Sequence, residues 1–394
     1  MLGLVFWGLA THLEPAATVG RASAEIAAMT LLANIAQLSF GSIFERFLPV
    51  AGNQTRRFVI RAYMLCEAVA LVLAIGYVLL GLGHKFIESA LVWRALFIVA
   101  VLLWTIFILQ DSALIGLRAS RWVPVENISF ALAKLALLPA LIVVAAREGV
   151  FIAWTSPVAV AIFGVSWYLF KKRIPEHEAR NASTEALPKT REIIFLASAQ
   201  YASFVLNVIS SSIVSLIVID RLGAVANAHY YLPAVISSGP ALLLISLTTS
   251  FLVEASSEPH ELRHHANMTI ATAFAVLIPS MAVGEIFAPD LLRIFGNSYA
   301  QHGTTLLRLL ILSLPGMAVT TFYSSFAWLD KNVWWLAIRE LASAVVYFTV
   351  LFIFIGHFGI LAIGIASVTS SGLQGLFFLP ISIRRYRMTA RLAD

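Results

Sequence analysis

The chain has 394 residues, of which 60% are hydrophobic and 12% are charged, and its formal net charge is +6. A typical soluble domain carries about 25% charged residues, so this composition excludes a soluble globular enzyme, a disordered chain and a fibrous repeat. The single cysteine, Cys66, excludes a disulfide framework and any metal centre built from several cysteines. The sequence therefore predicts an all-α integral membrane protein.

Apolar runs follow one another along the whole chain, and a spanning helix needs about 20 mostly apolar residues. The first run, 1–13, is short; the others occupy 26–48, 58–83, 90–110, 122–146, 150–170, 193–219, 229–253, 267–288, 304–329, 333–356 and 358–383. This pattern predicts about twelve transmembrane helices if the first run counts.

The longest polar segment, 171–192, lies between the sixth and seventh predicted spans. It divides the chain into an N-terminal six-helix bundle over 1–170 and a C-terminal six-helix bundle over 193–383, followed by a basic tail over 384–394. All other loops are short, so no extramembrane domain is expected in which catalysis could be housed.

Lys and Arg residues predict the orientation, because cytoplasmic loops carry an excess of them. Sixteen lie in the tail and in the loops after even-numbered spans, whereas five lie in loops after odd-numbered spans. We therefore expect a multi-pass protein of the cytoplasmic (inner) membrane with the linker and both termini in the cytoplasm. The positive net charge is therefore explained by the orientation in the membrane, and no nucleic-acid partner is expected. No cleaved signal peptide is visible at the N-terminus.

A faint internal repeat relates the two halves. Val19-Gly20 and the small residues after it resemble Leu222-Gly223 and the small residues after that pair, 203 positions later. The counterpart of the seventh span would then begin about ten residues before Met1. From this offset we expect the first helix to be truncated.

Several ordered stretches resemble the MOP superfamily, which includes polysaccharide and O-antigen flippases and multidrug exporters. They are 19–24 leading through 26–41 to Arg46-Phe47-Leu48-Pro49, then 294–299 followed by 306–310, and finally 356–359 running into 363–366. Their order and spacing cover essentially the whole chain. They are more similar to the polysaccharide-exporter branch than to the drug-exporter branch.

This resemblance implies two six-helix bundles arranged in a V, with a central cavity that opens alternately to each side. It also implies a polyprenyl-diphosphate-linked saccharide as substrate, no cofactor, and polysaccharide-assembly glycosyltransferases or a polymerase as partners. Two features depart from the pattern: the first span is truncated, and the chain has twelve spans where some relatives have fourteen. Certain drug-exporting relatives use an acidic residue in the first helix for ion coupling, and 1–13 contains none.

Ionisable residues inside spans cost about 2.5–3.5 kcal/mol on insertion scales and are functional candidates by default. Lys134 lies midway along its span, where it either meets an anionic substrate in a cavity or pairs with Glu126, two helical turns away. Glu67, the other deep charge, is either a proton carrier or a counter-ion for Lys134. We favour the counter-ion.

Two further groups are candidates for the cavity wall. The first is four arginines within about two turns of a span end, whose long side chains commonly snorkel to the interface: Arg61, Arg94, Arg308 and Arg339. The second is a polar stripe on the seventh span, which either lines a sugar-binding cavity or joins helices: Gln200, Ser203, Asn207 and Ser211, with Ser215 continuing the four-residue spacing.

One motif favours an enzyme. His260-Glu261-Leu262-Arg263-His264 matches H-E-x-x-H, in which two histidines bind zinc and the glutamate activates water. The motif lies in a short loop and no Asp-Gly dipeptide follows on a later span, so we expect neither a metal site nor a catalytic residue here. A membrane glycosyltransferase is the other enzyme alternative, and its acidic external loop is missing.

The function predicted from the sequence is therefore export of a polyprenyl-diphosphate-linked saccharide by alternating access. A cation-coupled multidrug exporter of the same superfamily is the alternative, which the basic surplus within the spans disfavours. No G-x-x-x-x-G-K-[ST] phosphate loop occurs, so we do not expect ATP as the direct energy source.

Overall fold

A computed structural model describes residues 2–180, 190–257, 261–329 and 333–391. Within these ranges the chain is all-helical, as predicted, and contains no strand. The helices are α1 (Leu2–Leu13), α2 (Ala16–Ala36), α3 (Phe40–Phe47), α4 (Thr55–Leu79), α5 (Leu91–Gly116), α6 (Trp122–Ala145), α7 (Gly149–Tyr168), α8 (Ile174–Arg180), α9 (Thr190–Leu222), α10 (Ala224–Ser257), α11 (Leu262–Arg293), α12 (Asn297–Leu312), α13 (Leu314–Leu329), α14 (Val333–Phe358) and α15 (Leu361–Arg391). Short turns η1 (Leu48–Val50), η2 (Gly52–Gln54) and η3 (Ala146–Glu148) and the π-helical η4 (Leu169–Arg173) connect some of them.

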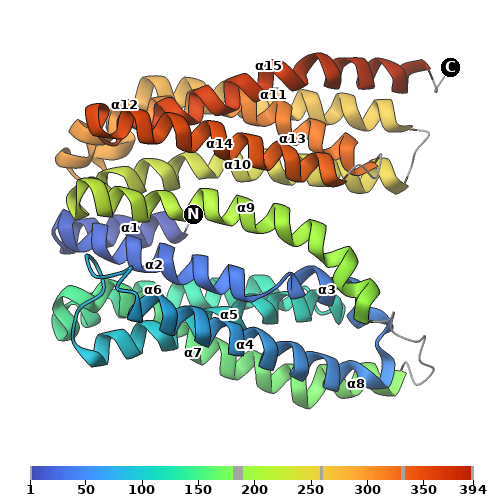
Figure 1. Cartoon of the computed structure of the whole chain (residues 1–394), viewed down its shortest axis with the longest axis horizontal. Coiled ribbons are helices and arrows are strands. Elements are labelled where there is room, and N and C mark those ends of the chain that lie inside the picture. The colour runs from blue at the N-terminus through green and yellow to red at the C-terminus, as the bar shows by residue number, and fades with distance from the viewer. Residues whose placement is uncertain (1, 181–189, 258–260, 330–332, 392–394) are drawn as a thin grey trace. The chain divides into compact units, whose positions relative to one another are not determined.

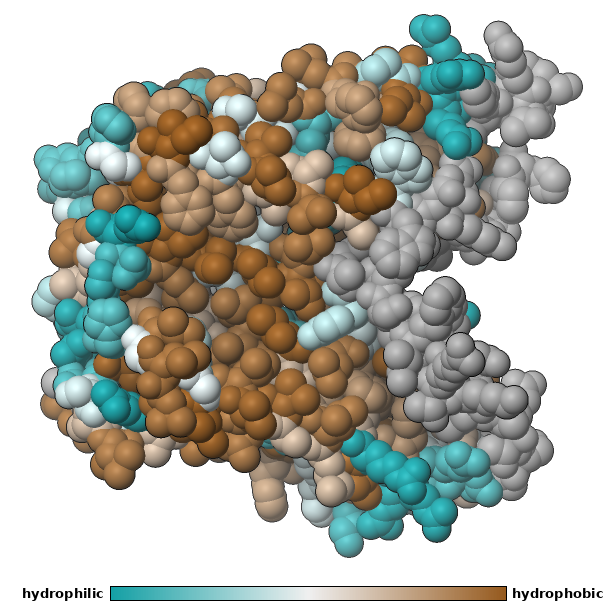
Figure 2. Space-filling model, viewed as in Figure 1, coloured by the Kyte–Doolittle hydropathy of each residue, from teal (hydrophilic) through white to brown (hydrophobic). Residues whose placement is uncertain are grey.

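Ten helical segments of the described chain are long and apolar enough to cross a membrane, and an eleventh is formed if α2 and α3 count as one bent span. The twelve predicted spans are close to this number, and α1 is the short first one. Hydrophobic side chains cover the middle of the helices, and hydrophilic ones gather near the helix ends (Figure 2). Because hydrocarbon offers no hydrogen-bond partner to the backbone, helices of this kind are what a bilayer requires.

The second predicted span, 26–48, differs from the structure in two ways. Its helix begins ten residues earlier, at Ala16, and it breaks after Ala36 with a bend of 49°. Leu38 and Ser39 have positive φ angles of 48° and 61° at the break. Tertiary contacts add to the backbone hydrogen bonds there: the Tyr201 hydroxyl donates to Ile35 O at 2.7 Å, and the Cys66 thiol donates to Gln37 O at 3.5 Å.

Contacts divide the chain into two compact units, residues 1–228 and 229–394. The first contains α1 to α9 and the first residues of α10, and in it α2 packs along α9, α4 against α5, and α6 against α7 (Figure 1). The second contains the rest, in which α15 packs against α13 and α14. The boundary thus lies after α9, whereas the sequence places a linker at 171–192, of which 181–189 fall outside the described residues. The division into two six-helix bundles stays a prediction.

A buried polar corner fixes α9 and the start of α10 in the first unit. Asn227 is fully buried, and its amide donates to Gly20 O at 2.8 Å and to the Ser23 hydroxyl at 3.0 Å. Its Oδ1 accepts a hydrogen bond from Ser215 at 2.8 Å. A Cβ at Gly20 would lie 1.8 Å from the Ala224 carbonyl oxygen, so the two backbones approach as closely as only glycine allows.

Candidate functional site

Lys134 lies in a cage of aromatic rings inside the first unit. Its ammonium is 3.4 Å from the ring centroid of Trp154 on α7, 4.7 Å from that of Phe130 one turn earlier on α6, and 5.3 Å from that of Phe6 on α1. The residue is 4% exposed. Three helices therefore surround the cation with the electron-rich faces of rings, which attract it electrostatically.

The cage is itself held by a larger aromatic cluster. The Trp154 ring packs against the rings of Phe6, Trp7, Trp104 and Phe130, with centroid distances between 5.2 and 6.4 Å. Offset and edge-to-face pairs at these distances add to the energy of burial. Sequence reasoning missed this cage, because only Phe130, four residues before Lys134, can be placed beside the lysine from helical spacing alone.

Neither acidic residue considered as a partner forms an ion pair with Lys134 among the described side chains. Both carboxyl oxygens of Glu126 are buried without a hydrogen-bond partner, and so is Oε1 of the half-buried Glu67. Among the described side chains, Lys134 is therefore contacted by ring faces instead of a carboxylate. Lys134 also does not line the cavity beside Glu25 and Glu148 or the groove between α6 and α7.

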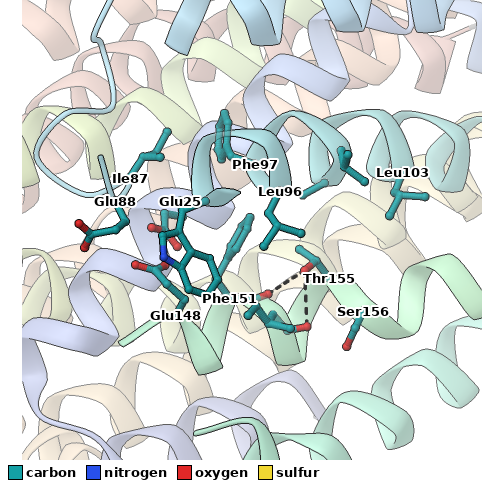
Figure 3. Close-up of a pocket in the computed structure, with 14 residues that line it drawn as sticks. Glu25, Ile87, Glu88, Leu96, Phe97, Leu103, Glu148, Phe151, Thr155 and Ser156 are labelled. Carbon is teal, nitrogen blue, oxygen red and sulfur yellow. Dashed lines mark hydrogen bonds between the residues drawn. The ribbon is translucent and has the colours of Figure 1, made fainter. Parts of the chain in front are cut away.

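A second constellation, not anticipated from the sequence, surrounds a cavity of about 150 Å³ at the α6–α7 corner (Figure 3). Glu25 on α2 and Glu148 in η3 point toward one another at its mouth, and they are 4% and 6% exposed. The other lining residues are mainly apolar and aromatic: Ile87, Glu88, Trp93, Leu96, Phe97, Val99, Ala100, Leu103, Phe151, Ile152, Thr155 and Ser156.

The two carboxyl groups lie near enough to interact electrostatically, and like charges in such a buried site repel each other. Burial raises the pKa of Glu148, which lies between two spans, while the nearby cation of Arg147 acts in the opposite direction. Arg147 donates to Glu88 at 2.6 Å, and its Nε is 3.8 Å from Glu148. The cavity mouth is thus an acidic site with two nearby cations, Arg147 and Arg21.

The other predicted site residues do not cluster with the Lys134 cage or with the Glu25 and Glu148 pair. Arg61 and Arg94 are exposed on α4 and α5. In the second unit Arg308 donates to Glu285 O at 3.1 Å, and the Arg339 guanidinium donates to the neighbouring Glu340 carboxylate. Both of these arginines therefore have local partners.

The polar stripe on α9 is described only in part. The side chains of Gln200 and Ser203 lie outside the described residues. Asn207 and Ser211 are exposed, and the Ser211 hydroxyl donates to Val208 O at 3.1 Å. Ser215, at the end of the stripe, is buried and bonds to Asn227. That residue joins helices, and the role of the rest of the stripe stays a prediction.

The H-E-x-x-H motif precedes and opens α11. His260 lies outside the described residues, and His264 is exposed. His265 instead approaches Glu254, with 3.2 Å between Nδ1 and Oε2. No group of three His, Cys, Asp or Glu residues within the described ranges is arranged to hold a metal ion.

Comparison with solved structures identifies the fold. The chain is similar to a multidrug-resistance MATE family transporter of the MOP superfamily in an inward-facing conformation (TM-score 0.67, 15% identity, 99% of this chain and 96% of that chain). It is also similar to a transporter of that description in an outward-facing conformation (0.60, 15%, 99% and 95%). A MOP superfamily transporter from Pyrococcus furiosus, described as having a binding pocket of reverse polarity, matches with a TM-score of 0.60 (14%, 98% and 92%).

No protein-family model and no curated protein matches the sequence. At 13–15% identity the structural comparisons show the fold. The chain is therefore a multi-pass membrane protein with the fold of the MATE transporters of the MOP superfamily.

Proposed function

We propose that the chain is an alternating-access transporter that moves an amphiphile with an anionic head, namely a polyprenyl-diphosphate-linked saccharide. The fold supports the mechanism, because its neighbours include inward-facing and outward-facing transporters. The observation that carries the substrate class is the buried ammonium of Lys134, which has ring partners and no carboxylate partner among the described side chains.

The physical argument rests on charge balance. A diphosphate cannot cross hydrocarbon unless fixed cations compensate it, and a buried lysine that is already paired with a carboxylate offers no net charge for this. Ring faces stabilise the ammonium by about 2 kcal/mol when it is desolvated, yet they leave its formal charge uncompensated. An approaching phosphate would therefore gain a strong charge-assisted hydrogen bond from Lys134.

The test uses purified protein in vesicles that contain a fluorescent polyprenyl-diphosphate disaccharide. A membrane-impermeant quencher reports transfer of the probe between leaflets. We expect faster transfer than in vesicles without protein, a loss of about tenfold or more in Lys134→Met, and substantial retention in Lys134→Arg, which keeps the charge. Transfer at the rate of empty vesicles, or equal rates for wild type and Lys134→Met, would overturn the proposal.

A second candidate, export of organic cations, is favoured by the cavity beside Glu25 and Glu148. Its carboxyl groups and the rings of Trp93, Phe97 and Phe151 form the acidic, aromatic lining that suits a lipophilic cation. Two structural neighbours are described as multidrug-resistance transporters.

The two candidates separate in one experiment. Vesicles that take up tetraphenylphosphonium in a Glu148-dependent way, with no transfer of the diphosphate lipid, would identify the cation exporter. Glu148→Gln is the informative variant, because it keeps the side-chain size and removes the charge. The saccharide exporter requires the reverse pattern, with transfer that depends on Lys134 and is indifferent to Glu148.

We further propose the cytoplasmic membrane as the location, with both termini in the cytoplasm and saccharide-assembly enzymes as partners. The buried Cys66 is the only cysteine in the sequence, so a Cys66→Ala background is cysteine-free. In it, a maleimide that cannot cross membranes should label Asp394→Cys only after cells are permeabilised. Labelling of intact cells would contradict the proposed orientation.

A further inference from the structure

A groove of about 360 Å³ lies between α6 and α7, near the end of the first unit where α6 begins. Trp122, Val125, Val160, Trp167 and Tyr168 are among its lining residues. Four of these five are exposed, most of all Val160 at 76% and Trp167 at 62%. These two belong to a helix that is long and apolar enough to cross a membrane, and apolar side chains exposed on such a helix are accessible to lipid.

Glu126 lies in the wall of this groove and has no partner in the described chain. It is 6% exposed, and neither of its carboxyl oxygens has a hydrogen-bond donor. The charge that acts on it from a neighbouring helix has the same sign: it is the carboxyl group of Asp111 on α5, whose Oδ2 accepts from Asn127 at 3.3 Å. An unpaired buried carboxyl group is costly. A donor from outside the chain would remove that cost.

The groove has an aromatic and basic end, and Glu126 lies further along α6. Trp122 and Tyr168 pack against each other at this end, with 4.9 Å between ring centroids and the rings tilted by 45°, where aromatic residues gather at a membrane interface. Exposed basic residues cluster at the same end of the unit: Arg118, Arg121, Lys171 and Lys172. Glu126 follows Trp122 by four residues, or about 6 Å along the helix.

We propose that this groove binds a membrane phospholipid whose head group carries an ammonium with N–H donors, such as phosphatidylethanolamine. The lipid phosphate would lie at the basic end, and its ammonium would donate to Glu126. Charge complementarity selects this occupant: an anionic lipid brings no donor for the carboxyl, and a choline head group has a cation without N–H groups. The inference does not depend on which substrate the chain transports.

The first test changes only the lipid. Purified protein is exchanged with phosphatidylethanolamine, its N-methyl and N,N-dimethyl forms, and phosphatidylcholine, all with the same acyl chains, and retained lipid is counted by native mass spectrometry. We expect retention to fall with each methyl group, by roughly tenfold across the series, as for the loss of charged hydrogen bonds. Equal retention across the series would overturn the proposal and identify a groove for acyl chains alone.

The second test changes the site. Glu126→Gln should lower retention of phosphatidylethanolamine by about tenfold and remove its preference over phosphatidylcholine. Glu67→Gln is the matched control, because Glu67 is a carboxyl of the same unit with an unpartnered oxygen and does not line the groove. Unchanged selectivity in Glu126→Gln would overturn the assignment. Should that variant fail to fold, the lipid series on the wild-type protein still decides.

Discussion

The ammonium of Lys134 lies 3.4 Å from the ring centroid of Trp154, and the two residues come from adjacent helices α6 and α7. This pairing lets a lysine stay in the middle of a span without a carboxylate beside it. The ring provides attraction without neutralising the charge. The arrangement links the packing of the first unit to the substrate class that we propose, because the same ring that stabilises the cation also fixes where it can act.

Trp154→Leu should destabilise the first unit, since it removes the closest ring from the cation and a large side chain from the aromatic cluster. We expect a loss of about 3 kcal/mol or more, of which up to about 2 kcal/mol is cation–π attraction. In a double-mutant cycle with Lys134→Met, measured by unfolding in detergent, the two losses should be non-additive by about 1 kcal/mol or more. Simple additivity would show that the ring does not stabilise the charge.

Stability should fall as pH rises because of Glu148. Burial raises the pKa of its carboxyl above the ordinary value of 4.5, so the folded chain holds this proton more tightly than the unfolded chain does. The advantage is present below the ordinary pKa and is lost as pH rises through the native one. Arg21, Glu25, Glu88 and Arg147 are the charged groups around it.

The check is a series of melting temperatures in detergent between about pH 4.5 and 8. Glu148→Gln should melt with a shallower pH dependence than the wild-type protein, because glutamine does not titrate. Wild type and variant with the same slope would mean that Glu148 is not the group responsible.

Gly20→Ala should be strongly destabilising, although alanine normally favours a helix by up to about 1 kcal/mol over glycine. The added Cβ would lie 1.8 Å from the carbonyl oxygen of Ala224, so α2 and the start of α10 would have to separate. Gly76→Ala on α4 is the control, because its Cβ meets nothing within 4 Å. Thermal unfolding of both variants measures the difference, and similar melting temperatures would contradict the close contact.

Arg173 should be irreplaceable by lysine. Its Nη2 donates to Leu117 O at 2.9 Å and to Arg118 O at 3.3 Å, while Nη1 bonds to Glu176 at 3.0 Å. The planar guanidinium bonds to carbonyl groups at the end of α5 and to the Glu176 carboxylate of α8 at the same time, which the compact ammonium of lysine cannot do. Arg173→Lys should cost about 1–3 kcal/mol of stability, whereas the exposed Lys172→Leu should cost little. Equal melting temperatures for these two variants would refute this role.

Much of the fold could be predicted from the sequence, because a bilayer requires long apolar helices and these are visible as apolar runs. The break in α2 could not, since Tyr201 and Cys66 stabilise it from other helices. Lys134 is recognisable as a deep charge, yet Phe6 and Trp154 reach it only in the folded chain. Glu25 was missed because the predicted span began one residue later, at Ile26, which placed this buried acid outside the membrane core.

The corner around Asn227 bears on how the protein assembles during synthesis. The packing of the first unit is complete only when Asn227 bonds to Gly20 and Ser23, which lie more than 200 positions upstream. A ribosome that has finished the polar stretch at 171–192 has therefore not yet delivered α9, which this unit needs. The nascent chain must hold an incomplete helix bundle in the bilayer until α10 begins to emerge, and a split form of the protein would have to be cut beyond Ala228 to keep that bundle whole.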